Sequence, residues 1–487
     1  MEERKGFGTN FGFLMAAVGS AVGLGNIWGF PNKMGASGGF TFLIIYLILA
    51  VLCGFIVMVG ELAIGRKTGK GAVEAYHVLS KKFKWMGWMG ILSAFFILFF
   101  YCARGGYCIK YVVLNVGDLF GAGFGSNAMA AVADANGTSV GAEVFGAFLG
   151  NPTEAIIYGL IFVAITMLIV IGGVGGGIEK VCSVGMPALF VMLLICIVRA
   201  CTLPGAVNGL KYMFVPGWAV TNGVIEKAPD FLTVLATAGG QMFFSLSLGM
   251  GAMITYGSYL QKKENLQKNA ILIIVMDTLV ALMAGLCVIP GRFALDPDGT
   301  LGGPKLLFIT MQNVFSRMGG LGPIFGILFY LLVVFAAVSS SISLLEVIVA
   351  HFVDKARDEG KGDKRKTYTL IAAACVGLGC ILVCADALGS TGFAPGNLLG
   401  MTGELPTWAA DWLDFWDMLS EGIMMPLGAL LMSLMIGWEV GPEMVKAECE
   451  QSGHAMSGYG FFKICVKFIT PLCMILILYG QIKEFFF

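Results

Sequence analysis

Two apolar stretches of the sequence are interrupted by glycines, and both interruptions contain residue types that can bind ions. The first reads GSAVGLGN over residues 19–26 and the second reads SLSLGMG over residues 245–251. A helix broken inside hydrocarbon exposes backbone groups that are costly when unpaired. Freed N–H groups suit a carboxylate, and freed carbonyls suit a hard cation. The alternative is that these glycines only allow helices to pack closely, although two breaks at matching positions favour a binding site.

Two further polar features lie inside apolar stretches. Asp277 stands within the apolar residues 271–286, and a carboxylate inside a membrane helix is costly enough to indicate a functional group. Ser339, Ser340 and Ser341 form a run of hydroxyls that could contribute oxygen ligands to a cation. These hydroxyls could instead bond to carbonyls of their own helix.

Membrane helices must position these residues, because the composition is not that of a soluble domain. The chain is 57% hydrophobic and 13% charged, against about 25% charged residues in ordinary soluble domains. Apolar runs of about 20 residues, the length that crosses a bilayer, recur over almost the whole chain. We expect an all-α integral membrane protein with eleven spans, at roughly 10–33, 38–65, 86–117, 153–171, 181–201, 231–257, 267–290, 322–352, 368–388, 416–440 and 462–482.

The two glycine-broken spans are the first and the sixth, so they lie five spans apart. Spans one to five then run opposite in direction to spans six to ten, which predicts an inverted repeat with a binding site at the interface of the repeats. The repeats would cover roughly residues 10–202 and 231–440, with an additional eleventh helix at 462–482. The whole chain, residues 1–487, would form one polytopic domain.

Basic residues fall on one side of this predicted topology. They precede the first span and follow the second, and others lie between spans six and seven and between spans eight and nine: Arg4, Lys5, Arg66, Lys67, Lys70, Lys81, Lys82, Lys84, Lys262, Lys263, Lys268, Lys355, Arg357, Lys361, Lys364, Arg365 and Lys366. The positive-inside rule places the N-terminus in the cytoplasm and, with an odd number of spans, Phe487 outside. We predict a multi-pass protein of the cell membrane.

Other function classes find little support in the sequence. Net charge is zero, which does not indicate a nucleic-acid partner. The 13 cysteines and three histidines have no metal-ligand spacing. An HExxH motif and a clustered base and nucleophile are also absent, so we do not expect an enzyme.

The sequence resembles the neurotransmitter:sodium symporter family over nearly its whole length, and the bacterial members most closely. The most specific matching motifs are GSAVGLGNIWGFP at 19–31, GQMFFSLSLGMG at 240–251, the serines 339–341 and ELAIGR at 61–66. The resemblance implies the leucine-transporter fold and sodium-coupled symport of amino acids by alternating access. In that mechanism a bundle of spans one, two, six and seven rocks against a scaffold.

Two sodium sites are implied by the resemblance. One would use the carbonyl of Ala21, the side chain of Asn26, Ser245, Asp277 and the substrate carboxylate. The other would use the carbonyls of Gly19, Val22 and Ala336 with the hydroxyls of Ser339 and Ser340. Asp277 stands where many relatives carry a sodium-binding Asn, so it would supply the negative charge that chloride brings in animal relatives. We therefore expect no chloride requirement.

The resemblance also implies an amino-acid pocket at the breaks. The substrate carboxylate would meet the amides of Leu24 and Gly25 and the hydroxyl of Tyr101, and the ammonium would meet backbone carbonyls. The substrate-binding set is Ala21, Gly23, Leu24, Gly25, Ile97, Tyr101, Phe244, Ser245, Ser247, Met250, Ser340 and Leu344. Its wall is almost wholly apolar, so we expect hydrophobic or aromatic substrates, and the flexible Met250 predicts broad selectivity among them.

Gate residues are implied on both sides of the pocket. The inner gate would pair Arg4 with Asp354, supported by Ser258 and Tyr259, and Phe244 would close the outer side of the pocket. Glu61 would accept hydrogen bonds from the unwound first span.

The outer gate of the family is incomplete in this sequence. The tenth-span Asp417 lacks its usual arginine partner, because Gly29 stands in that position. Arg104 is expected to replace the arginine by pairing with Asp417. In a second hypothesis it faces the pocket and receives an anionic group of the substrate, and in a third it snorkels without a role.

Two other functions remain open at this point. The chain could be a sensor that binds an amino acid without moving it, or it could carry a non-protein amine that lacks a carboxylate. The intact ligands of both sodium sites and the two intact cytoplasmic gate partners favour transport of an amino acid. The expected partners are a small-molecule substrate and membrane lipid, and the oligomeric state is left open.

Overall fold

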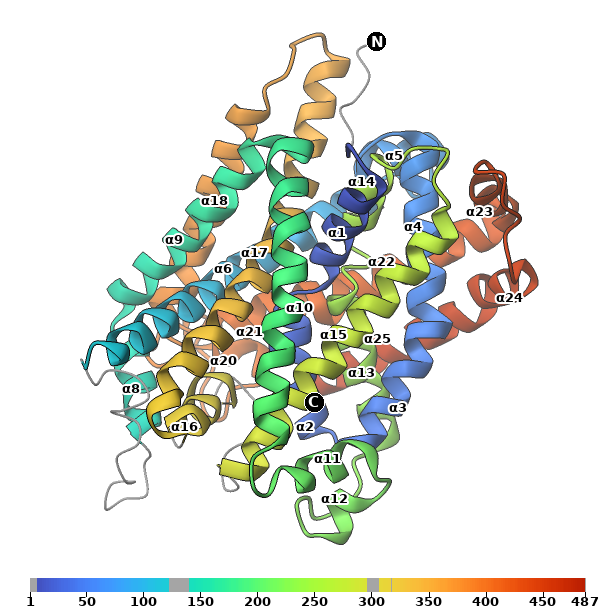
Figure 1. Cartoon of the computed structure of the whole chain (residues 1–487). Helices are drawn as coiled ribbons and strands as arrows, with labels where there is room; N and C mark the ends of the chain where they lie inside the picture. The colour runs from blue at the N-terminus through green and yellow to red at the C-terminus, as the bar shows by residue number, and fades with distance from the viewer. Residues whose placement is uncertain (1–6, 122–139, 296–305, 317, 487) are drawn as a thin grey trace.

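The computed structural model describes residues 7–121, 140–295, 306–316 and 318–486, and all regular structure in these ranges is helical. Nine helices are long and apolar enough to cross a membrane, and a bent pair makes a tenth span. The long helices run mainly between two ends of the molecule (Figure 1). We call the end that carries Phe7 the N-terminal face and the other end the opposite face.

The first span is broken where the glycines predicted. Helix α1 (Asn10–Ala21) is capped by the side chain of Thr9 and ends before Val22, whose backbone is extended. The chain resumes in η1 (Gly25–Gly29) and α2 (Phe30–Ala36), with a bend of 46° between the two halves. Residues 22 and 23 therefore present backbone groups that are not part of a helix.

The sixth span is broken in the same way. Helix α13 (Phe231–Ser245) and helix α14 (Ala252–Gly257) are separated by residues 246–251. Ser247, Gly249 and Gly251 have φ angles of 54°, 80° and 77°, a region that glycine enters without steric cost. A Cβ at Gly249 would lie 2.2 Å from the carbonyl oxygen of Met425, so this break also requires the close approach that only glycine allows.

The remaining spans lie close to the predicted ranges. They are α3, η2 and α4 (Phe40–Thr68), α6 (Met86–Leu119), α9 (Pro152–Ile171), η3 with α10 (Val174–Cys201), α15 (Leu266–Leu295), α17 (Gly322–Asp358), α18 (Arg365–Asp386), α21 to η7 (Trp412–Val440), and α24 to α25 (Tyr459–Phe486). The fifth begins at Val174 rather than near residue 181, because the glycine-rich residues 174–179 form a π-helical turn that leads into α10.

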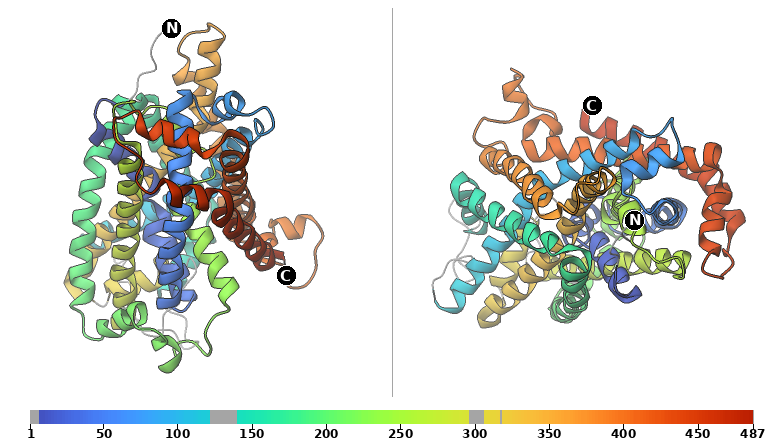
Figure 2. Two further views of the ribbon diagram at one scale, coloured as in Figure 1. Left: turned by 90° about the vertical axis from the view of Figure 1, so that its right-hand side faces the viewer. Right: turned by 90° about the horizontal axis from the view of Figure 1, so that it is seen from above.

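Short helices cover the two faces (Figures 1 and 2). The N-terminal face carries α5 (Ala72–Leu79), α23 (Pro442–Glu450) and the α17–α18 connection. The opposite face carries α8 (Val140–Leu149), α11 (Ala206–Phe214), α12 (Trp218–Thr221), η4 with α16 (Leu306–Ser316), α19 (Pro395–Leu398) and α20 (Thr407–Ala410). The η5 turn (Gly319–Leu321) leads into α17.

The helices pack as two groups around the breaks. Helix α6 packs against α17, α9 and α18, whereas α14 packs on α4 and α15 packs on both α4 and α1. Helix α1 also lies against α10 and α17. Apolar side chains such as Val191, Leu194 and Val198 of α10 remain exposed, which is the surface expected to face lipid. The broken segments are thus enclosed between the two groups.

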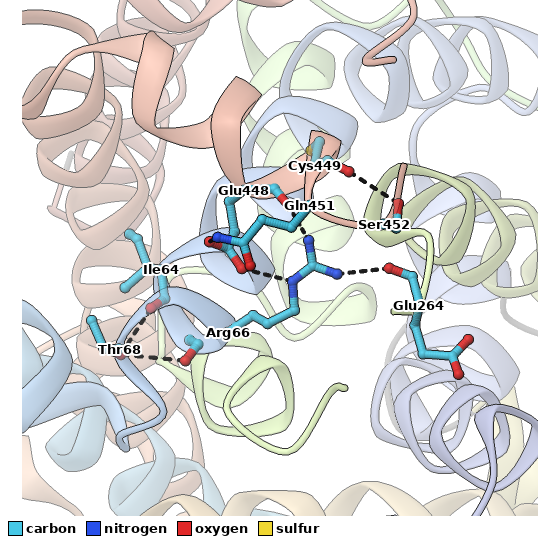
Figure 3. A network of polar contacts seen from close by, with 9 residues as sticks. Ile64, Arg66, Thr68, Glu264, Glu448, Cys449, Gln451 and Ser452 are labelled. Atoms are coloured by element: carbon cyan, nitrogen blue, oxygen red, sulfur yellow. Dashed lines mark hydrogen bonds and ion pairs between the residues drawn. The ribbon is translucent and has the colours of Figure 1, made fainter. Parts of the chain in front are cut away.

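A buried ion pair fastens one end of α4 on the N-terminal face (Figure 3). Arg66 Nε donates to Glu448 Oε1 at 2.9 Å, Nη1 donates to the Glu264 carbonyl at 2.7 Å, and a further bond reaches the Glu448 carbonyl. Both side chains are 1% exposed. The guanidinium therefore ties α4, the connection that follows α14, and α23 into one unit.

Replacing Glu448 with Ala is expected to destabilise the protein by about 3–5 kcal/mol, because it leaves the buried Arg66 without its counter-charge. The matched control is Glu450→Ala in the same helix, whose contact with Lys446 is exposed and 3.9 Å long and should contribute at most about 1 kcal/mol. Thermal unfolding in detergent measures both. Equal melting temperatures for the two variants would contradict the prediction.

Candidate functional site

The first break faces the serine run of α17. Ser339 Oγ lies 3.3 Å from the Val22 carbonyl oxygen and 2.9 Å from that of Ala336. Ser340 Oγ lies 3.1–3.3 Å from the carbonyl oxygens of Gly19, Ser20 and Val22. The five oxygens expected for the second sodium site therefore lie close together, around the two serine hydroxyls.

Ser341 points in another direction, although it is the next residue. Its Oγ lies 2.7 Å from Thr166 Oγ and donates to the Val338 carbonyl at 2.9 Å. The triplet thus divides by helix geometry: two hydroxyls face the broken α1, and the third joins α17 to α9.

A second polar cluster surrounds Asp277, which is completely buried in α15. Asn26 Nδ2 donates to Asp277 Oδ1 at 2.7 Å, Ser245 Oγ donates to both carboxylate oxygens at 3.0 and 3.1 Å, and Tyr46 OH lies 3.4 Å from Oδ2. These donors are neutral, and among the described residues no charged side chain acts on this carboxylate. A buried negative charge with only neutral donors suits a cation.

Asn26 connects this cluster to the first break. Its Oδ1 accepts from the Gly23 amide at 2.9 Å, and its Nδ2 also donates to the Asp277 carbonyl at 3.0 Å. Ala21 is buried next to the same break, and Ser245 ends α13 at the second break. The four protein residues expected for the first sodium site are therefore brought to one region.

A small cavity of about 10 Å³ lies between the two clusters, enough for about one water molecule. It is lined by Ser20, Ala21, Gly23, Gly25, Ile97, Tyr101, Phe244, Ser247, Met250, Ser340 and Leu344. The breaks, α6 and α17 all contribute to its wall. Entry of an amino acid therefore requires the wall to move apart.

Glycine is required where the break meets α6 and α17. Tyr101 OH accepts from the Leu24 amide at 3.0 Å. A Cβ at Gly23 would lie 2.2 Å from Ser340 Oγ and 2.5 Å from Tyr101 OH, and one at Gly25 would lie 3.0 Å from the Phe244 ring. The first break thus packs directly against the hydroxyls that the sequence singled out.

Sequence reasoning missed three residues of the site. Ser20 lines the cavity, and its carbonyl accepts from Ser247 Oγ at 2.8 Å, where Ser247 has the positive φ noted above. Gln241 Nε2 donates to the Gly25 carbonyl at 2.7 Å, and Tyr46 reaches Asp277. Ser20 and Gln241 lie inside the quoted motifs, so a polar residue in an apolar motif was the available signal.

Glu61 contacts a different break from the one expected. Its Oε1 accepts from the Gly249 amide at 2.7 Å, in the sixth span rather than the first. The reason is packing: α4 lies along α14, which follows the second break. The expectation for Glu61 was therefore wrong about its partner but correct that a broken backbone supplies the donors.

On the N-terminal face, Tyr259 and Asp354 line a cavity of about 900 Å³. Asp354 Oδ2 accepts from the Gly71 amide at 3.2 Å, and Ser258 Oγ donates to the Thr255 carbonyl at 2.5 Å. Arg4, the expected partner of Asp354, lies outside the described residues. The inner gate pair thus stays a prediction.

The structure adds an ion pair that the sequence reading overlooked. Arg365 donates to both oxygens of Glu346 at 2.6 and 2.8 Å, a bidentate geometry. Tyr259 OH donates to the same carboxylate at 2.7 Å, so this network joins the end of the sixth span to α17 and α18. Glu346 is completely buried in an apolar run, as Asp277 is. A carboxylate inside a membrane helix is costly, so the argument that identified Asp277 as a functional group would also have identified Glu346.

On the opposite side of the pocket, Arg104 and Asp417 do not meet in the described structure. The Arg104 guanidinium carbon lies 4.1 Å from the Trp28 ring centroid and 5.0 Å from that of Phe100, and the cavity lining does not include Arg104. Lys33 of α2 instead forms an ion pair with Glu421, one helical turn from Asp417. Pairing of Arg104 with Asp417 stays a prediction for another state of the protein.

Two broken membrane helices, two converging sets of oxygen atoms and a small enclosed pocket define a membrane carrier of a small solute. The chain belongs to the sodium:neurotransmitter symporter family, whose model matches residues 4–119 and 147–486. The family consists of sodium-coupled transporters, which confirms the expected family, the all-α leucine-transporter fold and the transporter class.

Individual relatives agree with this assignment. The chain is 32% identical over 481 residues to the uncharacterized sodium-dependent transporter YhdH of Bacillus subtilis, with 96% of each chain covered. It is 28% identical over 495 residues to an uncharacterized sodium-dependent transporter of Haemophilus influenzae, with 98% of each chain covered. The crystal structure of MhsT in complex with L-phenylalanine has a TM-score of 0.82 and 32% identity, covering 98% of this chain and all of MhsT.

Proposed function

We propose that this protein carries hydrophobic or aromatic amino acids together with sodium across the cell membrane, by alternating access and without chloride. The observation that carries the proposal is the convergence of two oxygen clusters and the buried Asp277 on one pocket between the two broken helices. The N-terminal face would be cytoplasmic, as the positions of the basic residues indicate.

Sodium would bind in both oxygen clusters. The carbonyls of Gly19, Val22 and Ala336 with Ser339 and Ser340 offer five oxygens to one ion, and oxygen is the ligand that hard cations prefer. Ala21, Asn26, Ser245 and Asp277 offer oxygens to the other, together with the substrate carboxylate. These four residues form the first sodium site, and the substrate carboxylate would complete it. Binding of sodium and binding of the amino acid would therefore each raise the affinity for the other by the same factor.

The pocket suits an amino acid with an apolar side chain. Leu24 N–H and Tyr101 OH already meet each other, so a carboxylate placed between them would accept from both groups. The wall around the side chain is made by Ile97, Phe244, Met250 and Leu344. MhsT, the structural relative, was crystallised with L-phenylalanine, which fits this assignment.

The absence of a chloride requirement would follow from Asp277. Its carboxylate receives bonds from Asn26, Ser245 and Tyr46, so the negative charge is fixed beside the expected sodium. A cation in a buried site needs a counter-charge, and a residue that is always present removes the need for a free anion. The protein would then work equally with any anion in solution.

The mechanism would use the two groups of helices described above. Helices α1, α4, α14 and α15 would rock as a bundle against α6, α9, α17 and α18, with the breaks at the pivot. Sodium between α1 and α17 would hold the bundle in the state that faces outward. No covalent step is required, because the sites supply only oxygen ligands and backbone donors.

Uptake into proteoliposomes tests the proposal. Radiolabelled phenylalanine, leucine and tryptophan would be offered with an inward sodium gradient, with potassium in place of sodium, and with gluconate in place of chloride. We expect accumulation that requires sodium and is unchanged by gluconate. Sodium-dependent binding without accumulation would instead indicate a sensor, and binding that is independent of sodium would indicate a solute without a carboxylate.

A further inference from the structure

A partly buried ion pair lies beyond the pocket, on the side away from the N-terminal face. Lys33 lies on α2, the half of the broken first span that follows the pocket, and its ammonium contacts Glu421 in η6 (Met418–Met424) of the tenth span. The Lys33 and Glu421 side chains are 26% and 8% exposed. The pair therefore joins the movable half-helix to a different part of the protein.

The surroundings make separation of the pair costly. Asp417 lies one turn before Glu421 and has a buried Oδ1 with no hydrogen-bond partner in the described structure, and Glu484 of α25 also attracts Lys33. A lysine held inside the membrane is stable when it faces carboxylates. Asp417 already attracts Lys33 and contacts Glu421, so when α2 tilts away from Glu421 the long lysine side chain can transfer to the Asp417 carboxylate one turn away.

Lys33 is the residue of α2 that brings a positive charge to this connection. Lys33 is the one basic residue of the α2 sequence FPNKMGA. A side chain at Gly29, just before α2, would place its Cβ 2.8 Å from Gln241 Oε1, and Gln241 is held by the Gly25 carbonyl. Arg104 is stacked on Trp28, and its charge acts on Asp411 and Asp414 and not on Glu421.

We propose that the Lys33–Glu421 ion pair is the latch that holds α2 against the tenth span when the pocket is closed on the side opposite the N-terminal face. Breaking this pair is the step that admits solute from that side, and Asp417 receives Lys33 while the latch is open. The inference rests on the transport function proposed above and names the positioning residues that control access to its pocket.

Thiol accessibility of the pocket tests the latch without any substrate. Leu344→Cys, on α17 in the pocket wall, serves as the reporter, with labelling of the endogenous cysteines subtracted. A membrane-impermeant methanethiosulfonate reagent would be applied in sodium to the side opposite the N-terminal face. We expect labelling about tenfold faster than in the reporter protein alone for Lys33→Met, for Glu421→Gln and for the double variant. The factor should be the same in all three, because each of them removes the same single interaction.

Lys110→Met is the matched control. Lys110 pairs with Glu154, which joins α6 to α9 within the scaffold, so labelling should not change. The exchanged variant Lys33→Glu with Glu421→Lys retains the ion pair and should label slowly even when a single variant fails to fold. Three outcomes would overturn the latch. The single variants could label at the unchanged rate, the double variant could show the product of the two single-variant rate increases, or the exchanged variant could label fast. Failure of the transport proposal would instead appear as reporter proteins that label as expected although the wild-type protein takes up no amino acid.

Discussion

Asp277→Asn is expected to make transport dependent on chloride. In chloride-free medium, sodium-driven uptake by the variant should fall by about tenfold or more, the effect of losing at least about 1.4 kcal/mol of sodium binding. The asparagine retains the size of the side chain and keeps an oxygen near Ser245 and Asn26, but it removes the fixed negative charge. Chloride in the medium should restore a substantial part of the uptake.

Neighbouring groups are the reason to expect that chloride substitutes in the Asp277→Asn variant. Tyr46 OH and Ser245 Oγ already donate to the carboxylate, so they are oriented toward a negative charge at this position. In the variant, these hydroxyls are free to donate to an anion. A bound chloride would then replace the lost negative charge. The neutral donors would supply the hydrogen bonds that a buried anion needs.

The matched control is Asp230→Asn. Asp230 caps α13 with its side chain, and asparagine caps a helix equally well, so uptake should not depend on the anion. Uptake would be compared in sodium chloride and in sodium gluconate for wild type and both variants. Equal uptake in both media by Asp277→Asn would contradict the counter-charge role, and no uptake in either medium would show that chloride cannot replace this carboxylate.

The sequence was sufficient for the architecture because helices and their breaks depend on local patterns. Apolar runs located the spans, and the glycines at 19–25 and 249–251 located both breaks. The fifth span was the exception, because residues 172–177 are rich in glycine and weaken the apolar signal, although residues 174–179 form a π-helical turn. Hydropathy reports composition, and it does not report backbone geometry.

Contacts between distant segments were less accessible to the sequence. The partner of Glu61 was misplaced because either broken helix offers free amides, and only the packing of α4 on α14 decides between them. Lys33 and Glu421 are 388 positions apart, and Arg365 reaches Glu346 from another helix. Long charged side chains span several ångströms, so their partners depend on the relative placement of helices.

The serine run shows what the resemblance added. Periodicity alone could not decide which of the three hydroxyls bonds to its own helix, because Ser339 and Ser341 each donate to the carbonyl three residues earlier. The resemblance selected Ser339 and Ser340, and in the structure these two also face the carbonyls of the first break. The choice depends on which side of α17 meets α1, and the local sequence does not contain that information.

Ser340→Ala is expected to raise the sodium concentration needed for half-maximal uptake by about tenfold or more, because it removes an oxygen that faces three carbonyls of the first break. Alanine is a good helix former, so α17 should be unaffected. Ser341→Ala is the control: Ser341 faces Thr166, which also donates to the Phe162 carbonyl and stays paired after the change. Sodium titrations of uptake at saturating amino acid measure both variants. Equal sodium dependence in the two variants would show that the oxygens between α1 and α17 hold the break together without binding the ion that drives transport.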